Sequence, residues 1–323
     1  MSSHLKHGKI GYFDMVKISF ICPVYNKVKY LPSVLDSIKN QVGEFKKEFI
    51  FINDGSTDDS LSYLKNETSK WKNTKIINQK NKGPSYATQV GIKNSTGDFI
   101  KLVGGDDIMS PICTKILLNT IKKTNSVAVF SEYKLIDTYK KINFKKQEEK
   151  LFLTINKPLK ATILSAFSGT TPNLYSNEAL KKSKGCDTRI FVEDFSLVLR
   201  LSKYGSFSFI KNVTCFGPKN DQNRIMLGQT NQLLHDYNAA LYYFIKENIN
   251  IKKEYKIIAC KKALGRAEKW YRRTQKKTIF SKINYLRIMY YFSQNDEINL
   301  LKESCKPFYL DNRKLRKIRY RVI

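Results

Sequence analysis

The sequence predicts an α/β protein built on a doubly wound, mostly parallel sheet, followed by a helical carboxyl-terminal region. Two patterns favour this fold class. Short apolar runs alternate with segments of helical spacing up to about residue 130, as successive βα units do. From about residue 231 the alternation stops and only helical spacing continues to the end. A chain of 323 residues can bury one large α/β core with an appendage, or two modest domains.

The βα units follow one another along the chain. The apolar run 17–22 predicts the first strand, and the apolar spacing of 30–41, with a proline near its start, predicts the first helix. The later strands are expected at 48–52, 75–78, 98–103 and 127–130, and the later helices at 58–71, 85–94 and 112–122. In a parallel sheet of this kind, ligands bind beyond the carboxyl ends of the strands.

The alternation loosens after residue 130. The polar, charged run 140–150 is expected to be a surface excursion. A turn before a short strand is expected at 169–172, and helices are expected at 177–183 and 195–204. The expected domains are an amino-terminal extension at 1–16, the α/β domain at 17–225 and the helical region at 226–323.

The composition is that of a globular protein from a reducing compartment. Hydrophobic residues make up 41% and aromatic residues 12% of the chain, which argues against disorder. The six cysteines are scattered, so neither a zinc site nor a disulfide scaffold is indicated. No stretch approaches the roughly 18 apolar residues of a membrane span, and 1–16 lacks the apolar core of a secretory signal. We therefore expect a cytoplasmic protein, either free or peripheral at the inner face of the membrane.

One loop carries the strongest sign of a ligand site. The apolar strand that ends at Val103 runs into Gly104 and Gly105 and then into Asp106 and Asp107. Glycines let a phosphate come close to the backbone, and two carboxylates are hard oxygen donors that suit Mg²⁺ or Mn²⁺. The alternative is an ordinary Gly-Asp turn whose aspartate caps the next helix.

Three further stretches follow a fixed order around this loop. They are Pro23-Val24-Tyr25-Asn26, the N-D-G-S-T-D-D-S run at 53–60, and Phe191-Val192-Glu193-Asp194. Together with the Asp-Asp loop they resemble the motifs of the inverting GT-A glycosyltransferases of family 2, over residues 17–210. The resemblance implies the GT-A nucleotide-diphospho-sugar transferase fold, with a nucleotide-binding half up to about residue 135 and an acceptor half after it.

The resemblance also implies a nucleotide-binding set. Asp54 matches the aspartate that recognises the nucleotide and would accept the imide N–H of a uracil, although this stretch could be a plain turn. Two groups complete the set: Pro23, Val24 and Tyr25, with Asn26, as a wall against the base or ribose, and Asn81, Lys82 and Gly83 beside the nucleotide.

Metal-binding and catalytic residues follow from the same resemblance. Asp107 would ligate a Mn²⁺ or Mg²⁺ ion that bridges the diphosphate, and Asp106 would contact the ribose or the hydrated ion. Gly104 stands where many relatives have another carboxylate. Asp194 would be the base that deprotonates the acceptor hydroxyl, with Glu193 orienting the acceptor or the loop. Alternatively, both acidic residues only cap the helix that follows.

Two further departures leave roles open. Relatives often have an arginine where this chain has Thr88, so a cationic contact to the nucleotide would be missing or supplied by Lys82. The stretch 215–220 stands where relatives often have Y-R-x-H. Lys219 or Arg224 could neutralise phosphate there instead.

Positive charge is concentrated in the carboxyl-terminal region. The chain carries a net charge of +30, and residues 251–323 hold 21 Lys and Arg against 6 Asp and Glu. The basic run 313–321 and the apolar, aromatic stretch 279–292 suit an amphipathic face on an anionic membrane. A helical appendage packed on the α/β domain is the alternative. His235 lies in a helix-like run and is interpreted as a packed or surface histidine, not a ligand.

The predicted function is the metal-dependent, inverting transfer of a sugar from a nucleotide-diphosphate donor, expected to be a UDP-sugar, to a hydroxyl of a glycan or glycolipid. Such a reaction belongs to polysaccharide or lipooligosaccharide synthesis. A polyprenyl-phosphate sugar synthase is disfavoured because membrane spans are missing from the sequence. A non-catalytic nucleotide- or glycan-binding module is an alternative. A nucleic-acid-binding protein is another, but no recognisable binding motif accompanies the basic region, so no nucleic acid partner is expected.

Overall fold

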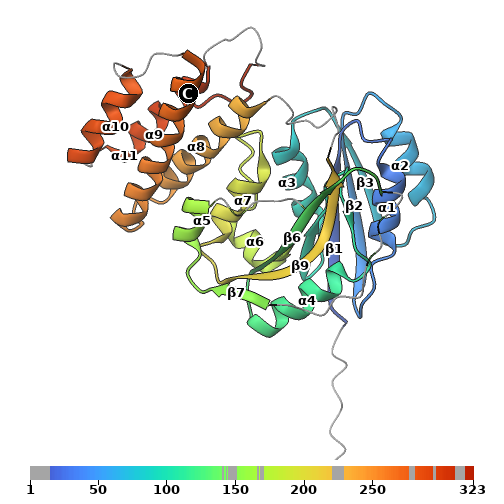
Figure 1. Ribbon diagram of the computed structural model, residues 1–323. Coiled ribbons are helices and arrows are strands. Elements are labelled where there is room, and N and C mark those ends of the chain that lie inside the picture. Colours follow the sequence, from blue (N-terminus) through green and yellow to red (C-terminus); the bar gives the residue numbers. More distant parts are fainter. Residues whose placement is uncertain are drawn as a thin grey trace, which may run out of the picture.

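The computed structural model describes residues 15–139, 142, 144, 151–165, 167, 171–219, 229–275, 281–293, 296–309 and 317–323. They form an α/β layered body with a group of helices packed at one side (Figure 1). The predicted fold class is therefore confirmed. Almost all of the predicted extension at 1–16 and of the excursion at 140–150 lies outside the described residues, as does Arg224.

The first half of the sheet is parallel, as predicted. Its strands, in the spatial order β3-β2-β1-β4, are β1 (Lys17–Val24), β2 (Lys46–Asp54), β3 (Thr74–Gln79) and β4 (Phe99–Leu102). The connecting helices are α1 (Leu31–Lys39), α2 (Ser60–Thr68), α3 (Pro84–Asn94) and α4 (Cys113–Thr124). Strand β1 is buried along most of its length, because helices cover both faces of the sheet.

The second half of the sheet is mixed. The order continues from β4 as β8 (Asn173–Ser176), β6 (Ala128–Ile136), β9 (Phe207–Pro218) and β5 (Ile108–Met109), while β7 (Leu151–Ile155) pairs with β9. Strand β8 runs antiparallel to both β4 and β6. The sequence patterns gave no range for β5, β7 or β9, nor for the helix α5 (Leu159–Ser165). The helices α6 (Asn177–Ser183) and α7 (Glu193–Leu201) agree with prediction.

Two apolar clusters sandwich the sheet. Residues of α1, α2 and α4 pack on one face, and residues of α3, α6 and α7 pack on the other. Because β1, β2 and β4 are parallel, the connections that follow them leave the sheet at the same carboxyl edge, between the two helical layers. This edge carries the predicted motif loops.

The carboxyl-terminal region contains α8 (Thr230–Glu247), α9 (Lys253–Gln275), α10 (Lys282–Ser293), α11 (Glu297–Glu303) and the 3-10 turn η2 (Lys306–Tyr309). The expectation of helix to the end of the chain is wrong for residues 317–323, which contain no helix. Tyr320 has a φ of +58°, a left-handed conformation that a right-handed helix excludes. Ile318 and Val322 are nevertheless buried. This segment is therefore packed on the protein.

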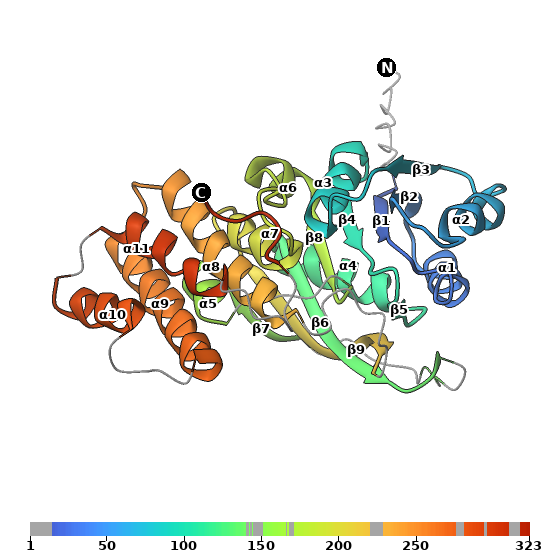
Figure 2. The same cartoon turned by 90° about the horizontal axis from the view of Figure 1, so that it is seen from above.

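The helical region shares a core with the α/β body. One apolar cluster joins α8, α9 and α11 to α5 and α7, and Figure 2 shows α8 lying beside α7. The rings of Phe195 on α7 and Tyr237 on α8 have centroids 5.0 Å apart. Within the described ranges, none of the helices combines the length and apolar composition that crossing a bilayer requires. The domain boundary near residue 225 stays a prediction.

Candidate functional site

The first two motif loops are joined by hydrogen bonds at the carboxyl edge. The Asn26 backbone N–H donates to Ser56 Oγ at 3.1 Å, and the Thr57 backbone N–H donates to Asn26 Oδ1 at 2.8 Å. Asn26 has a φ of +53°, which asparagine tolerates better than most residues. Val24 is fully buried in the apolar core. The other three residues of the predicted wall against the base or ribose are partly exposed: Pro23, Tyr25 and Asn26.

Asp54 connects its own loop to the stretch that begins α3. Its carboxylate accepts hydrogen bonds from the backbone N–H groups of Lys82 and Gly83, at 2.9 and 2.8 Å, and from Gln79 Nε2 at 2.7 Å. A carboxylate offers about four acceptor positions, so three are used here. Two of the three bonds fall on Oδ1, and Oδ2 keeps an acceptor position. The predicted nucleotide residues are thus in direct contact, a linkage that no sequence signal revealed.

Asp106 lies against a buried lysine. Its Oδ2 is 2.6 Å from Lys27 Nζ, and the Lys27 side chain is only 6% exposed. The hydroxyl of Tyr139 donates to the backbone carbonyl of Asp106. Neither Lys27 nor Tyr139 was predicted, although Lys27 directly follows the first motif. The loop after β1 therefore places a cation against the loop that carries the predicted metal ligands.

Both carboxylate oxygens of Asp107 are oriented by hydroxyl groups. Tyr133 donates to Oδ1 at 2.7 Å, and Thr171 donates to Oδ2. The Gly104 backbone N–H donates to Thr171 Oγ1 at 2.9 Å. A Cβ at Gly217 would lie 2.6 Å from Asp107 Oδ1 and would overlap the Tyr133 hydroxyl. The absence of a side chain at Gly217 is thus required for this arrangement.

The two carboxylates fit a hard divalent cation. In the part of the chain that the structure describes, no cluster of three or more His, Cys, Asp or Glu residues gathers around them. Tyr133 and Thr171 each donate a hydroxyl bond to one Asp107 oxygen, and such bonds typically orient metal-binding carboxylates. One or two protein carboxylates are the usual number for Mg²⁺, which takes its other ligands from phosphates and water.

Glu193 and Asp194 form the start of α7, which begins two residues before the predicted residue 195. The Phe195 backbone N–H donates to Asp194 Oδ1 at 2.7 Å, so this carboxylate does bond within its own helix start. Both acidic side chains are half-buried. Burial, followed by the charge of Asp194, raises the pKa of the Tyr175 phenol in β8. The acidic pair therefore lies near the sheet.

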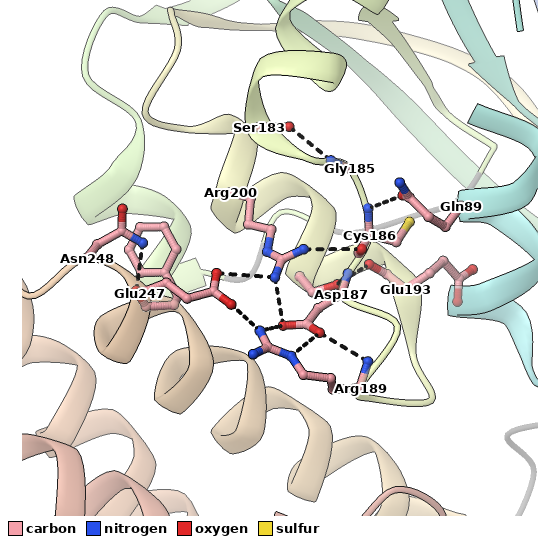
Figure 3. Close-up of polar contacts among 12 residues, drawn as sticks. Gln89, Ser183, Gly185, Cys186, Asp187, Arg189, Glu193, Arg200, Glu247 and Asn248 are labelled. Carbon is pink, nitrogen blue, oxygen red and sulfur yellow. Dashed lines mark hydrogen bonds and ion pairs between the residues drawn. The ribbon is translucent and has the colours of Figure 1, made fainter. Parts of the chain in front are cut away.

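A charged network fixes the segment before this pair (Figure 3). Asp187 accepts from Arg189 Nη2 at 2.6 Å and from Arg200 Nη2 at 2.9 Å. Both arginines also bond Glu247 on α8. The Cys186 backbone N–H donates to Gln89 Oε1, at 2.8 Å, on α3. The network was not predicted, because its members come from separate elements.

The segment also contacts the start of α3. Ser85 donates through its hydroxyl to the Phe191 carbonyl at 3.0 Å and through its backbone N–H at 3.3 Å. Gly83 has a φ of +91°, and a Cβ there would lie 2.6 Å from the Phe191 ring. Glycine is needed at this position on both counts. The loop of Asp54 and the segment of Asp194 are therefore linked through residues 82–85.

The remaining candidates lie apart from these contacts. Thr88 is fully buried, so its side chain faces the core. Lys219 Nζ is 3.8 Å from Asp137 Oδ1 in an exposed pair. His235 is fully buried with its Nδ1 2.7 Å from Asp236 Oδ1, in agreement with a packed histidine.

The fold and the motif loops define a nucleotide-sugar-transferase class of protein, and the comparison with known families agrees. Glycosyl transferase family 2 matches residues 19–200, more than half of the chain. The chain belongs to this family.

Individual relatives match different shares of the chain. An uncharacterized glycosyltransferase of Rickettsia bellii is 35% identical over 121 residues, which cover 38% of this chain and 17% of that protein. The chondroitin synthase of Escherichia coli is 25% identical over 220 residues, 67% of this chain and 30% of that protein. The matched part of this chain thus covers less than two thirds of the length of these curated relatives. The crystal structure of S. aureus TarS 1–349 in complex with UDP-GlcNAc aligns with a TM-score of 0.58 at 17% identity, over 90% of this chain and 81% of that one.

Proposed function

We propose that the protein transfers a sugar from a UDP-sugar to a hydroxyl of a glycan or glycolipid, with inversion at the anomeric carbon. One observation carries the proposal: the motif loops touch one another along one edge of the sheet. Asn26 bonds the loop of Asp54, Asp54 bonds residues 82 and 83, and Ser85 bonds the segment that leads into Asp194. The UDP-GlcNAc complex of TarS, a protein of the same fold, supports a UDP-linked donor.

Donor binding would use the Asp54 loop. The remaining acceptor position on Asp54 Oδ2 would take the imide N–H of uracil, and the exposed surfaces of Pro23 and Tyr25 would flank the base or ribose. Asp54 also stabilises the backbone at Lys82 and Gly83. A single carboxylate would thus both recognise the base and shape the loop at residues 81–83, which we call the donor loop.

Asp107, with Asp106, would hold a Mn²⁺ or Mg²⁺ ion. Such an ion supplies positive charge that stabilises the departing diphosphate. Tyr133 and Thr171 fix the orientation of Asp107. Lys27, on the loop after β1 and paired with Asp106, would add a positive charge beside this site, and preorganised groups of this kind stabilise a leaving diphosphate.

Asp194 would be the general base. It would take the proton from the acceptor hydroxyl while that oxygen attacks the anomeric carbon from the face opposite the diphosphate, and this displacement inverts the configuration. Its position is held by the Phe195 N–H bond and by the network around Asp187. Glu193 would orient the acceptor or the loop.

The test is a donor panel with purified protein, assayed by released nucleotide with and without Mn²⁺ and with candidate glycan acceptors. We expect release from a UDP-sugar and none from CMP-sugars. Binding of UDP-sugars without any turnover would support the non-catalytic nucleotide-binding module instead. No binding of any nucleotide would refute the proposal.

We also propose that the helical region contacts an anionic membrane surface through α10. Its exposed apolar side chains include Phe292, which is 78% exposed, and Tyr291, which is 69% exposed, with Tyr285, Ile288 and Met289 along the same helix. Exposed aromatic residues next to basic ones are typical of helices that lie in a membrane interface.

A further inference from the structure

A segment distant in sequence reaches the donor loop. Residues 317–323 lie beside α7 and α8 (Figure 2). Arg319 Nη2 donates to Asn81 Oδ1 at 3.0 Å, and the Tyr320 hydroxyl donates to the Lys82 carbonyl at 2.7 Å. Each bond joins residues 238 positions apart in the chain. The donor loop therefore has a support that the family's motifs do not include.

The body of the protein sets the position of this segment. The Gln232 side chain accepts from the Arg319 backbone N–H at 2.7 Å and donates to its carbonyl at 3.2 Å. The Tyr309 hydroxyl bonds both the N–H and the carbonyl of Val322, each at 3.0 Å. Gln232 is 2% exposed, so a buried side chain makes two of these bonds, and together the four bonds fix the position of the segment.

Arg319 also contacts the segment that leads into the proposed base. Its guanidinium lies 4.7 Å from the centre of the Phe191 ring, within the range of a cation–π interaction. Gly83 packs against the same ring. One side chain therefore touches both the donor loop, through Asn81, and the loop before Asp194, through Phe191.

The same anchor continues to the backbone before the base. Gln232 Nε2 donates to Asp236 Oδ1 at 2.9 Å, and Asp236 Oδ2 accepts the backbone N–H groups of Phe191 and Val192. Hydrogen bonds thus connect the segment 317–323 both to the donor loop and, through Gln232 and Asp236, to the loop before Asp194.

We propose that Arg319 is a positioning residue of the donor site, which holds the Asn81–Gly83 loop in the arrangement that binds the nucleotide. The proposal rests on the proposed function. Because Arg319 acts through Asn81 and Phe191, its loss should affect donor binding more than the chemical step.

The experiment compares Arg319→Ala with Arg321→Ala, a matched control. Arg321 lies in the same segment, and its replacement by alanine removes the same charge. Its guanidinium, however, lies 5.0 Å from the centre of the Tyr309 ring. We expect Arg319→Ala to weaken UDP binding and raise the donor KM by about tenfold, the scale of one hydrogen bond to a charged group. The kcat should stay within a few-fold, Arg319→Lys should recover part of the affinity, and Arg321→Ala should bind UDP as the parent does.

A double-mutant cycle with Asn81→Ala tests the route. If Arg319 acts through Asn81, the double variant should bind UDP no more weakly than the weaker single variant. Unchanged UDP affinity in Arg319→Ala, or an equal loss in Arg321→Ala, would overturn the inference and leave the proposed function standing. A parent protein that binds no nucleotide would refute both.

Discussion

The carboxylate of Asp236 accepts a hydrogen bond from the backbone N–H of Val192 at 2.8 Å. A helix of the carboxyl-terminal region thereby holds the residue that precedes the Glu193–Asp194 pair. Glu247, on the same helix, bonds Arg189 and Arg200 in the network beside it. The helical region therefore does more than cover the catalytic body, since it supports the segment that carries the proposed base.

Asp236 should make stability depend on pH. Burial raises its pKa above the ordinary 3.8, although bonds from His235, Val192 and Gln232 act the other way. A carboxyl with a raised folded-state pKa contributes stability that is fully present below its unfolded pKa and is lost as pH rises through the folded pKa. The unfolding free energy of the parent minus that of Asp236→Asn should therefore fall as pH rises from 3.8. Chemical denaturation across that window measures it, and a difference that rises with pH would contradict the assignment.

Asp194→Asn should abolish most transfer while donor binding survives. The amide keeps an oxygen that can accept the Phe195 N–H but cannot take a proton. General-base assistance contributes about 10²- to 10⁴-fold in rate, so kcat should fall by that factor. Transfer kinetics and UDP affinity are measured together, with Glu193→Gln as the companion variant. A kcat within a few-fold of the parent would show that Asp194 only caps α7.

Asp54→Ala should weaken UDP binding. The variant removes the proposed uracil acceptor and also the acceptor of two backbone bonds at residues 82 and 83. Hydrogen bonds to a charged group contribute about 1.5–3 kcal/mol, or about 10- to 100-fold in affinity. Calorimetry measures the change. Gln79→Ala is the control, because it leaves the carboxylate and its backbone bonds in place. Equal UDP affinity in Asp54→Ala and the parent would exclude the uracil assignment.

Asp107 variants should lose divalent-dependent turnover while the fold is retained. Asp107→Ala leaves the hydroxyls of Tyr133 and Thr171 without their carboxylate acceptor, so Asp107→Asn is the cleaner substitution. We expect the stimulation by Mn²⁺ to disappear in both variants, with a Tm close to that of the parent for the asparagine form. A Mn²⁺ titration of turnover, paired with Mn²⁺ binding in the presence of UDP, provides the measurement. Normal stimulation in Asp107→Asn would remove Asp107 from the metal site.

Charge substitutions on α10 should reduce binding to anionic vesicles. Deleting the predicted basic run 313–321 is a poor test, because Arg319 and Tyr320 bond the donor loop. Phe292→Glu on α10 avoids this. Ile249→Glu is the matched control, since Ile249 is an exposed apolar residue between α8 and α9.

Sedimentation with vesicles decides this prediction. The parent and Ile249→Glu should pellet with anionic vesicles at low salt and remain in solution with neutral ones, and Phe292→Glu should pellet less. Binding should weaken with salt, because the screening length shrinks from about 10 Å at 0.1 M to about 3 Å at 1 M. A parent protein that ignores anionic vesicles would remove the membrane proposal.

Strand β9 shows where sequence patterns were insufficient. Its residues Lys211 and Asn212 interrupt the apolar run, and its register with β6 shifts at two places. The strand forms because β6, β7 and β5 all pair with it, and pairing between distant segments leaves no local pattern. The parallel half was predictable because its buried strands and amphipathic helices are both local features.

The sequence by itself determined the fold class and placed the loops after β1, β2 and β4 at the carboxyl edge, because parallel strands bring their carboxyl ends to one side of a sheet. Only the tertiary structure decided what surrounds the predicted residues. Lys27 and Asp106 are 79 residues apart, Thr171 and Asp107 are 64 apart, and Arg319 and Asn81 are 238 apart. Such contacts depend on how helices and loops pack in the folded chain. Packing between distant segments leaves no periodic pattern in the sequence, so the sequence could not predict these contacts.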